Sequence, residues 1–589
     1  MTAPASPRSL APDLVAQIAG HATRRSDQVA LRFLRRGEEV EDEVTYAGLH
    51  RSAQVVACNL KAAGLVGRPV LVALPQGLDF VRCFLGCLYA GAIAVPTPAL
   101  GDPRGAERIL RIVEHAQPAA LIAPGDRYNP DAWATLRTLS PALDFVAAHD
   151  LVSGEPGETP PQRPADDIAF LQYTSGSTTN PKGVVVTGGN VSANLAMIQS
   201  AFAQDATNST VSWLPLHHDM GLLGCVLEPL SIGATAILMS PLSFLQKPVR
   251  WLRAMDRFEA TTAGAPNFAY DLCVRAIDRD QARTLDLSRW SLAFCGSEPV
   301  RAGTLTRFAD RFAASGFPAG AFYPCYGLAE ATLFVTGGDR GSGVQTASLP
   351  RQGGGAITAV CCGYPRNGTA ISVVEPEGTR RLPADAIGEI CVAGEQVSPG
   401  FWQADGSVRP DPGRELEIDG RRYLRTGDLG TVRDGSLYVV GRCKNMIIVR
   451  GMNIYAEDVE QTVLRQPGAA SWGAVAALGV LDGRGTEEGD EGLIIVCELA
   501  RGGELPAPDP LPALAEAISE THGILPLDIF VVPHGAITRT VSGKLQRDAT
   551  RLRLKNRDLS VLRHFQPIRI GRTPIHRLPS DNPHTRGTS

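Results

Sequence analysis

The segment from Tyr173 to Gly183 combines five Ser and Thr hydroxyls, two glycines and one lysine in the order YTSGSTTNPKG. Glycines let a backbone approach anionic oxygens, N–H and hydroxyl groups donate to them, and a lysine supplies charge. Apolar residues at 168–173 and 184–187 predict a strand on each side. These features favour a phosphate-binding loop over a plain polar surface loop. Its candidate contacts are Thr174, Ser175, Gly176, Ser177, Thr178 and Lys182.

The interval from Gly176 to Lys182 is that of a Walker A loop. Gly183 follows the lysine, however, so the Gly-Lys-Ser/Thr ending is absent. The sequence therefore does not indicate a P-loop kinase or ATPase.

Other charged residues stand in short segments where their chemistry is distinctive. Glu330 is a lone acid among small and apolar residues, which suits a Mg²⁺ ligand or a structural salt bridge. Asp428 lies in the turn RTGDLG, where it could accept hydrogen bonds from ligand hydroxyls or close an Asx turn. His217, His218 and Asp219 are consecutive, so their side chains point in different directions and a shared metal ion is awkward.

The bulk composition is that of a soluble globular protein. The chain has 589 residues, too many for one compact core, so two or more domains are expected. A net charge of -4 gives no reason to expect a nucleic-acid partner. Twelve scattered cysteines without a CxxC pair predict reduced packing residues and no zinc site. The absence of a signal sequence or membrane-length apolar stretch indicates a cytoplasmic enzyme.

The elements that would position the candidate residues begin with an α/β region. Up to about residue 340, short apolar strands alternate with helical patterns, as in folds with largely parallel sheets. The expected strands are 70–74, 93–95, 119–123, 168–173 and 184–187, with a helix at 79–90.

The Gly-rich stretch 341–355 predicts a loop, and the pattern of predicted elements changes after it. Shorter strands separated by turns predict a β-rich subdomain, at 370–374, 387–392 and 436–440. A boundary near residues 441–444 precedes a small α+β segment, with a helix at 456–465, a strand at 493–499 and a helix at 511–522. Residues 569–589 carry several Pro and Arg with little apolar content and read as a disordered tail.

The loop at 173–183 resembles the phosphate loop of the adenylate-forming superfamily, which includes acyl-CoA synthetases, luciferases and peptide-synthetase adenylation domains. Six further motifs resemble those of the superfamily and follow in its order, over roughly residues 20–550. They are LPLHHDMG (214–221), GSEP (296–299), YGLAEAT (326–332), YLRTGDLG (423–430), GRCKNMIIVRGMNIYAEDVE (441–460) and SGKLQRD (542–548).

The resemblance implies an α/β fold with a large N-terminal adenylation domain, residues 1–441, that binds acyl group and ATP. This domain would hold two parallel-rich sheets and the β-rich subdomain. A small, mobile α+β C-terminal domain, residues 442–568, would carry the catalytic lysine and rotate about a hinge at Lys444.

The resemblance also implies a role for individual residues. Glu330 is the implied Mg²⁺ ligand, and His218 would lie near the reacting carboxylate, although plain packing stays an alternative for it. Lys544 is the implied catalytic lysine, whose ammonium would bridge the attacking carboxylate and the phosphate. Asp428 would accept the ribose hydroxyls, and Arg442 would support the same ribose or the phosphates. The adenine would be flanked by Gly296, Ser297, Glu298, Pro299, Tyr326 and Gly327.

The stretch APNFAYDLC (265–273), together with the flanks of the HHDMG and YGLAEAT motifs, closely resembles fatty acyl-AMP ligases. Such enzymes convert a fatty acid and ATP to acyl-AMP and pyrophosphate. They then load the phosphopantetheine arm of an acyl carrier protein, here expected as a separate chain, in lipid, polyketide or lipopeptide biosynthesis. An acyl pocket is expected near Trp213, Met220, Leu223 and Phe268.

Two alternatives stay open. The segment 336–362 looks shorter than the usual insertion of fatty acyl-AMP ligases, which leaves a fatty acyl-CoA synthetase possible. A catalytically silent acyl-adenylate-binding protein is the third hypothesis, and the retained Lys544, Glu330 and Asp428 argue against it.

Overall fold

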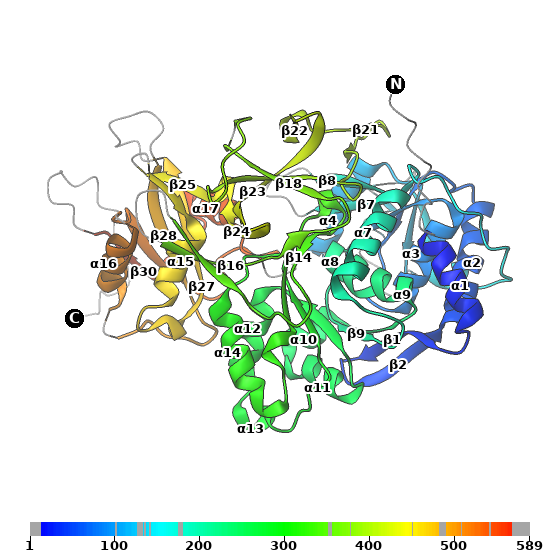
Figure 1. The fold of residues 1–589 in the computed structure, drawn as a ribbon, viewed down its shortest axis with the longest axis horizontal. Helices are drawn as coiled ribbons and strands as arrows, with labels where there is room; N and C mark the ends of the chain where they lie inside the picture. Colours follow the sequence, from blue (N-terminus) through cyan, green and yellow to red (C-terminus); the bar gives the residue numbers. More distant parts are fainter. Residues whose placement is uncertain are drawn as a thin grey trace, which may run out of the picture. The chain divides into compact units, whose positions relative to one another are not determined.

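The structure, a computed structural model, describes residues 13–99, 103–125, 134, 137–138, 140, 143–174, 181–350, 356–376, 378–449, 452–481, 491–507, 509–522, 524–540 and 544–567. The chain divides into two compact units, and Figure 1 shows their elements in colours that follow the sequence. Unit 1 comprises residues 1–444 and 539–544, and unit 2 comprises residues 445–538 and 545–589. The domain limits expected at residues 441 and 568 stay predictions, and the expected tail lies outside the described residues.

The largest sheet of unit 1 has nine strands in the order β17-β14-β13-β12-β11-β9-β10-β1-β2. Its strands from β13 to β1 are parallel, and β2, β14 and β17 add antiparallel edges. The strands are β1 Val29–Arg35, β2 Glu39–Thr45, β9 Ser209–Ser212, β10 Thr235–Met239, β11 Thr262–Ala265, β12 Leu292–Cys295, β13 Phe322–Gly327, β14 Phe334–Gly337 and β17 Tyr364–Pro365.

The second sheet of unit 1 has eight strands in the order β21-β20-β8-β7-β4-β3-β5-β6. They are β3 Pro69–Val72, β4 Ile93–Pro96, β5 Ala120–Ala123, β6 Asp144–Ala147, β7 Ile168–Thr174, β8 Lys182–Thr187, β20 Phe401–Trp402 and β21 Val408–Arg409. The strands β3, β4 and β5 are buried along their whole length, which accounts for their uninterrupted apolar sequences. The strands β7 and β8 are antiparallel and enclose the loop predicted to bind phosphate.

A third, antiparallel sheet of unit 1 has five strands. They are β18 Ala370–Val374, β19 Gly388–Ala393, β22 Glu415–Ile418, β23 Arg421–Arg433 and β24 Ser436–Arg442. A separate hairpin joins β15 Thr346–Pro350 to β16 Ala356–Val360. The expectation of a loop over 341–355 is therefore wrong for 346–350. The cause is that β15 pairs with β16 along its whole length although only Leu349 among its residues is buried, so the stretch lacks the alternating apolar pattern of a strand.

Helices cover the sheets of unit 1. They are α1 Leu14–Arg24, α2 Tyr46–Ala62, α3 Leu78–Ala90, α4 Pro103–Ala116, α6 Ala148–Leu151, α7 Gly188–Phe202, α8 Asp219–Leu222, α9 Glu228–Ile232, α10 Pro241–Gln246, α11 Val249–Arg257, α12 Asn267–Ala276, α13 Arg279–Ala282 and α14 Ala302–Phe312. A π-helical turn, η1 Leu223–Leu227, joins α8 to α9, and short 3₁₀ turns include η4 Ala329–Ala331 and η5 Pro412–Arg414. Figure 1 shows α1, α2 and α3 side by side, as their contacts require.

Local sequence explains where two of these helices begin and end. Thr187 caps α7 through a capping box, because its hydroxyl accepts the Asn190 N–H while its own N–H donates to the Asn190 side chain. Helix α3 is buried on nearly every face, and Gly91 ends it in the left-handed conformation. These starts and stops fix the strands β8 and β4 that lie next to them in the chain.

Unit 2 contains a four-stranded sheet in the order β27-β28-β29-β30 and a two-stranded hairpin. Its elements are β25 Met446–Val449, β26 Met452–Tyr455, α15 Ala456–Leu464, β27 Trp472–Leu481, β28 Glu491–Leu499, α16 Leu511–His522, β29 Asp528–Val532, α17 Arg547–Lys555 and β30 Arg563–Phe565. Apolar side chains of α15 and α16 pack on one face of the sheet in a single core cluster.

The predicted fold class is confirmed. The expected strands and helices, apart from the loop at 346–350, occur within a few residues of their predicted limits. All twelve cysteines are free thiols, as expected. Among the described residues, no helix is long and apolar enough to cross a membrane.

Candidate active site

Asp428 lies within strand β23, not in the turn expected from RTGDLG, next to Gly427, whose φ of 73° accompanies an irregularity in the pairing of β23 with β19. Its Oδ2 accepts a hydrogen bond from the Tyr326 hydroxyl at 2.7 Å, and its Oδ1 lies 2.8 Å from Arg442 Nε. The Asp428 carboxylate is buried, and it raises the pKa of the Arg442 guanidinium above its usual range. Asp428 and Arg442 are direct partners in the register of β23 and β24. Sheet pairing therefore unites two residues that belong to different sequence motifs.

Glu389 of the neighbouring strand β19 contacts the same part of β23. Its Oε1 accepts the Gly427 N–H at 3.0 Å, and its Oε2 pairs with Arg425. Thr426 contributes as well, because its hydroxyl accepts the Asp428 N–H at 3.1 Å. Both carboxylate oxygens of Asp428 keep lone pairs for further donors, such as the hydroxyls of a sugar.

Tyr326 and Gly327 end strand β13. Burial raises the pKa of the Tyr326 hydroxyl well above its usual range, so it stays protonated and donates to Asp428. A Cβ atom at position 327 would lie only 1.8 Å from the Leu333 carbonyl oxygen. Gly327 is thus required by the close return of the chain after the 3₁₀ turn η4, which carries Glu330.

The segment Gly296 to Pro299 follows β12, next to β13 in the sheet. Ser297 has a φ of 70°, a left-handed conformation that non-glycine residues adopt only where the surroundings enforce it. Glu298 Oε1 accepts the Phe268 N–H at 2.6 Å, and burial raises the pKa of the Glu298 carboxyl. These contacts fix the segment against the start of α12.

The predicted phosphate loop is described only at its two ends. Thr174 ends β7, and Lys182 begins β8. Ser175, Gly176, Ser177 and Thr178 lie outside the described residues. Lys182 Nζ lies 3.3 Å from Asp411 Oδ2 and 5.4 Å from the centroid of the Phe401 ring.

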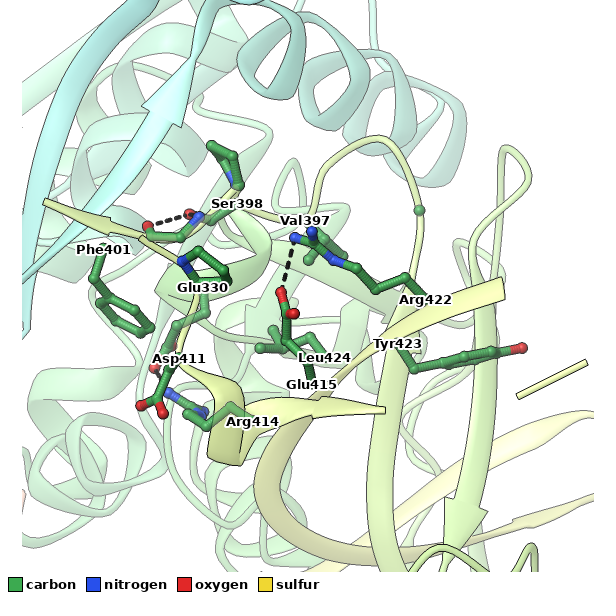
Figure 2. A pocket seen from close by; sticks show the side chains of 14 residues that line it. Glu330, Val397, Ser398, Phe401, Asp411, Arg414, Glu415, Arg422, Tyr423 and Leu424 are labelled. Carbon is green, nitrogen blue, oxygen red and sulfur yellow. Dashed lines mark hydrogen bonds and ion pairs between the residues drawn. The ribbon is translucent and has the colours of Figure 1, made fainter. Parts of the chain in front are cut away.

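Asp411 and Phe401 also line a pocket with about 260 Å³ of water-accessible space. Glu330 lies in the wall of this pocket, and its Oε1 is paired with Arg414 Nη1 (Figure 2). Arg414 is anchored further by the main-chain carbonyls of Arg425 at 3.1 Å and Thr426 at 3.0 Å. Lys182 therefore contacts one residue of the pocket wall, Asp411, and the predicted metal ligand Glu330 belongs to the same wall.

The residues present fit a magnesium ion at Glu330. The pairing with Arg414 engages one carboxylate oxygen and leaves Oε2 for another ligand. Among the described residues, no group of three His, Cys, Asp or Glu side chains could enclose a metal ion. A cation at Glu330 would therefore take its other ligands from phosphate oxygens and water, as Mg²⁺ commonly does.

His217 and His218 precede α8, and their ring centroids are 4.5 Å apart with planes inclined by 43°. Gln172 on β7 donates to the His217 carbonyl at 2.7 Å, which ties this segment to the strand before the phosphate loop. Asp219 is the first residue of α8, and burial raises the pKa of its carboxyl.

The expected acyl-pocket residues mostly gather in one apolar cluster. Trp213 stacks on Phe244 with centroids 4.0 Å apart and meets Phe268 edge-on at 6.0 Å. Met220 belongs to the same cluster, whereas Leu223 belongs to a neighbouring cluster of the core.

Lys544 belongs to unit 1 through the segment 539–544. Its N–H donates to Thr540 Oγ1 at 3.0 Å, and the Thr540 N–H donates to the Lys544 carbonyl at 2.8 Å. Burial lowers the pKa of the Lys544 ammonium, and the carboxylates of Asp219, Glu298 and Asp428 oppose that shift. The ammonium therefore lies in the field of acids from three separate motifs.

Sequence reasoning missed Glu389, Asp411 and Arg414, which hold the predicted residues in place. None of the three stands in one of the motifs listed above, and their partners lie far away in the sequence: Arg414 and Glu330 are 84 residues apart. Only a rule that links an acid to a distant basic residue could have found them, and the sequence contains no such signal.

Comparison with known protein families shows the family of the chain. The family model described as "AMP-binding enzyme" matches residues 18–402, well over half of the chain. The chain belongs to the AMP-binding enzyme family. This AMP-binding enzyme is 34% identical to the medium-chain-fatty-acid–[acyl-carrier-protein] ligase TtuA of Teredinibacter turnerae, over 94% of the chain and 96% of the relative.

Two further proteins are similar over nearly their full length. The enzyme is 32% identical to the medium-chain-fatty-acid–[acyl-carrier-protein] ligase JamA of Moorena producens, over 90% of the chain and 93% of that relative. It is also similar to the crystal structure of a fatty acid AMP ligase from Legionella pneumophila, with 34% identity and a TM-score of 0.67. That match covers 94% of this chain and 98% of the other. The resemblance to fatty acyl-AMP ligases is therefore confirmed.

Proposed function

We propose that this AMP-binding enzyme activates a fatty acid with ATP and then loads the acyl group on the phosphopantetheine thiol of a separate holo acyl carrier protein. The observation that best supports adenylation is the buried Asp428 carboxylate, held by Tyr326 and Arg442 with lone pairs to spare for a ribose. The names of TtuA and JamA, which specify a medium-chain fatty acid and an acyl carrier protein, support this choice of substrates.

In the proposed first step, an oxygen of the fatty-acid carboxylate attacks the α-phosphorus of ATP. A new bond from oxygen to phosphorus forms, and the bond to the bridging oxygen of the β-phosphate breaks, so pyrophosphate leaves with that electron pair. The products are acyl-AMP and pyrophosphate. The carboxylate and the phosphates all carry negative charge, so catalysis consists mainly of positioning and charge neutralisation.

The cationic groups of the site suit that task. Lys544 would stabilise charge on the attacking carboxylate and the α-phosphate, because the carboxylates of Asp219, Glu298 and Asp428 favour the charged form of its ammonium. Lys182 and the pocket beside Glu330 would receive the β- and γ-phosphates. Mg²⁺ at Glu330 would supply further neutralisation of the phosphates. The apolar cluster of Trp213, Met220 and Phe268 supports an acyl chain as the second substrate, and His218 would face its carboxylate.

In the proposed second step, the thiolate of the carrier attacks the acyl carbonyl carbon. The mixed anhydride breaks, the thioester forms, and AMP leaves. As the resemblance implies, the small domain would rotate about Lys444 between the two steps and bring a different face to the site. ATP and acyl carrier proteins occur in the cytoplasm, which supports the predicted cytoplasmic location.

Incubation with ATP, Mg²⁺ and a series of fatty acids tests the proposal. Mass spectrometry should detect acyl-AMP, and holo acyl carrier protein should be acylated faster than free coenzyme A. Efficient acyl-CoA formation would favour the acyl-CoA synthetase alternative instead. Lys544→Ala should nearly abolish fatty-acid-dependent pyrophosphate release, and unchanged release in a folded variant would refute the role given to Lys544.

A further inference from the structure

A buried group of charged side chains lies inside unit 2. Arg547 begins α17 and makes a two-point contact with Glu460 of α15, with Nε to Oε1 and Nη2 to Oε2 both at 2.8 Å. Its third nitrogen, Nη1, lies 3.0 Å from Oε1 of Glu457, one helical turn earlier on α15. A guanidinium that uses all three nitrogens in this way is fixed in position and orientation.

The acids of this group are tied to two further elements. Glu460 Oε1 also accepts the Ala477 N–H of β27 at 3.0 Å. Glu457 Oε1 also accepts the side-chain amide of Asn445 at 2.9 Å. The side chains of Arg547, Glu457 and Glu460 are 12%, 10% and 2% exposed, so water contributes little to their pairing.

Burial of this kind makes the group intolerant of displacement. Burial raises the pKa of the Glu457 carboxyl, and the Arg547 guanidinium opposes that shift. The two acids in turn raise the pKa of Arg547. Removing one partner from a buried ion pair leaves an uncompensated charge, which strongly destabilises the fold. The arrangement therefore has one stable geometry.

The two ends of the group coincide with two functional positions of the chain. Asn445 directly follows Lys444, the predicted hinge, and Arg547 comes three residues after Lys544. The chain segments on both sides of residues 539–544 are joined by a bond from the Gln546 N–H to the Thr538 carbonyl, at 2.8 Å. Leu545 packs against the core of unit 2, and Arg547, two residues later, forms ion pairs with buried acids.

We propose that Arg547 is a positioning residue for the first half-reaction. It fixes the start of α17, three residues after Lys544, to α15 and, through Glu457, to Asn445, which directly follows the predicted hinge. Lys544 acts only while acyl-AMP forms, so the proposal rests on the proposed function and concerns only that half of it. Displacement of a catalytic group by about 1 Å can lower a rate on the order of 100-fold.

The test measures the two half-reactions separately in purified full-length variants. The first readout is fatty-acid-dependent pyrophosphate release, and the second is transfer from chemically supplied acyl-AMP to holo acyl carrier protein. Arg547→Lys keeps the charge but loses the two-point contact with Glu460. We expect pyrophosphate release to fall roughly 30- to 100-fold and transfer to change less than about threefold.

Glu457→Gln provides a second, nearly isosteric variant in case Arg547→Lys does not fold. It keeps an oxygen for Arg547 and Asn445 but removes the charge, which weakens the contact by about 1 kcal/mol. We expect roughly a fivefold fall in pyrophosphate release, again without an equal fall in transfer. A matched control is Arg553→Lys on the same helix, since Arg553 donates to the Ala536 carbonyl at 2.6 Å and meets neither acid.

The outcomes separate a positioning role from a structural one. If both half-reactions fall in the same proportion in a folded variant, or if neither falls, the proposal is refuted. If the Arg553→Lys control gives the same imbalance, Arg547 has no special role and the proposal is also refuted. Lys544→Ala is measured alongside, because normal pyrophosphate release in that variant contradicts the proposed function, not the contacts of Arg547.

Discussion

The hydroxyl of Tyr326 offers a direct test of the nucleotide site. It donates to a buried carboxylate, Asp428 Oδ2, at 2.7 Å, and the only other side-chain anchor of that carboxylate among the described residues is Arg442. Tyr326→Phe removes this bond and little else, because the ring that packs in the core is kept. A hydrogen bond to a charged group contributes about 1.5–3 kcal/mol.

The expected loss can be converted to a kinetic parameter. At about 1.4 kcal/mol for each factor of ten, kcat/KM for ATP should fall roughly 10- to 150-fold. The proposed contact of Asp428 with the ribose would act in the ground state as well as in the transition state, so most of the loss should appear as a higher KM for ATP. The KM for the fatty acid should stay nearly constant. Pyrophosphate release at varied ATP and at varied fatty acid gives both values.

Tyr323→Phe is the matched control for this experiment. Tyr323 lies on the same strand, and its hydroxyl donates to the Gly338 carbonyl at 2.8 Å instead of to Asp428. This variant should lose stability without a change in the KM for ATP. A change of less than about threefold in kcat/KM for ATP in folded Tyr326→Phe would falsify the reasoning about Asp428.

Three further predictions concern titration and packing. The lowered pKa of Lys544 means that its ammonium loses its proton at a lower pH than free lysine; pyrophosphate release should therefore decline as pH rises through that pKa. Lys544→Arg, which stays charged, should lack this alkaline decline even if its rate is low, and an unaltered profile would count against the role of Lys544. Burial raises the pKa of Glu228 from 4.5 to about 8, so its neutral form stabilises the fold below pH 4.5 and this stability is lost as pH rises to about 8. Glu228→Gln should thus stabilise the protein relative to wild type by about 3 kcal/mol at pH 7 and hardly at pH 4.5, whereas an equal shift in Tm at both values would contradict it. Gly327→Ala would place a Cβ 1.8 Å from the Leu333 carbonyl oxygen and should destabilise by about 3 kcal/mol, while Gly224→Ala, whose Cβ meets Leu333 Cδ2 at 3.4 Å, should be nearly neutral; thermal unfolding of both variants decides this, and similar Tm values would show that the chain relaxes.

The parts of the site that were predictable are those carried by single continuous motifs. Asp428 and Arg442 stand in recognisable segments, and only their direct pairing across β23 and β24 required the structure. The pairing of Glu330 with Arg414 was not predictable. It depends on the packing of two 3₁₀ turns, η4 and η5, whose paired residues are 84 positions apart in the sequence. Arg547 stands in the motif SGKLQRD. Its buried partners on α15, however, are set by tertiary packing and could not be predicted from that motif.

The same distinction applies to the fold. Buried strands such as β3 and β4 can be predicted because they are apolar runs with glycine or proline near their ends. The hairpin of β15 and β16 gave no such signal, since its residues are small and partly exposed and gain their order from each other.

The pairing of β1 with β10 has a consequence for how the protein is made. Leu31 lies opposite Ala236, so strand β1 leaves the ribosome long before its partner exists. At about 5–20 residues per second, the interval is on the order of 10–40 s. During that time the apolar residues of β1 face water or a chaperone, and the sheet closes only after β10 emerges. Synonymous codons that slow translation between these strands should therefore lengthen the exposure of β1 and lower the yield of soluble enzyme without changing a single amino acid.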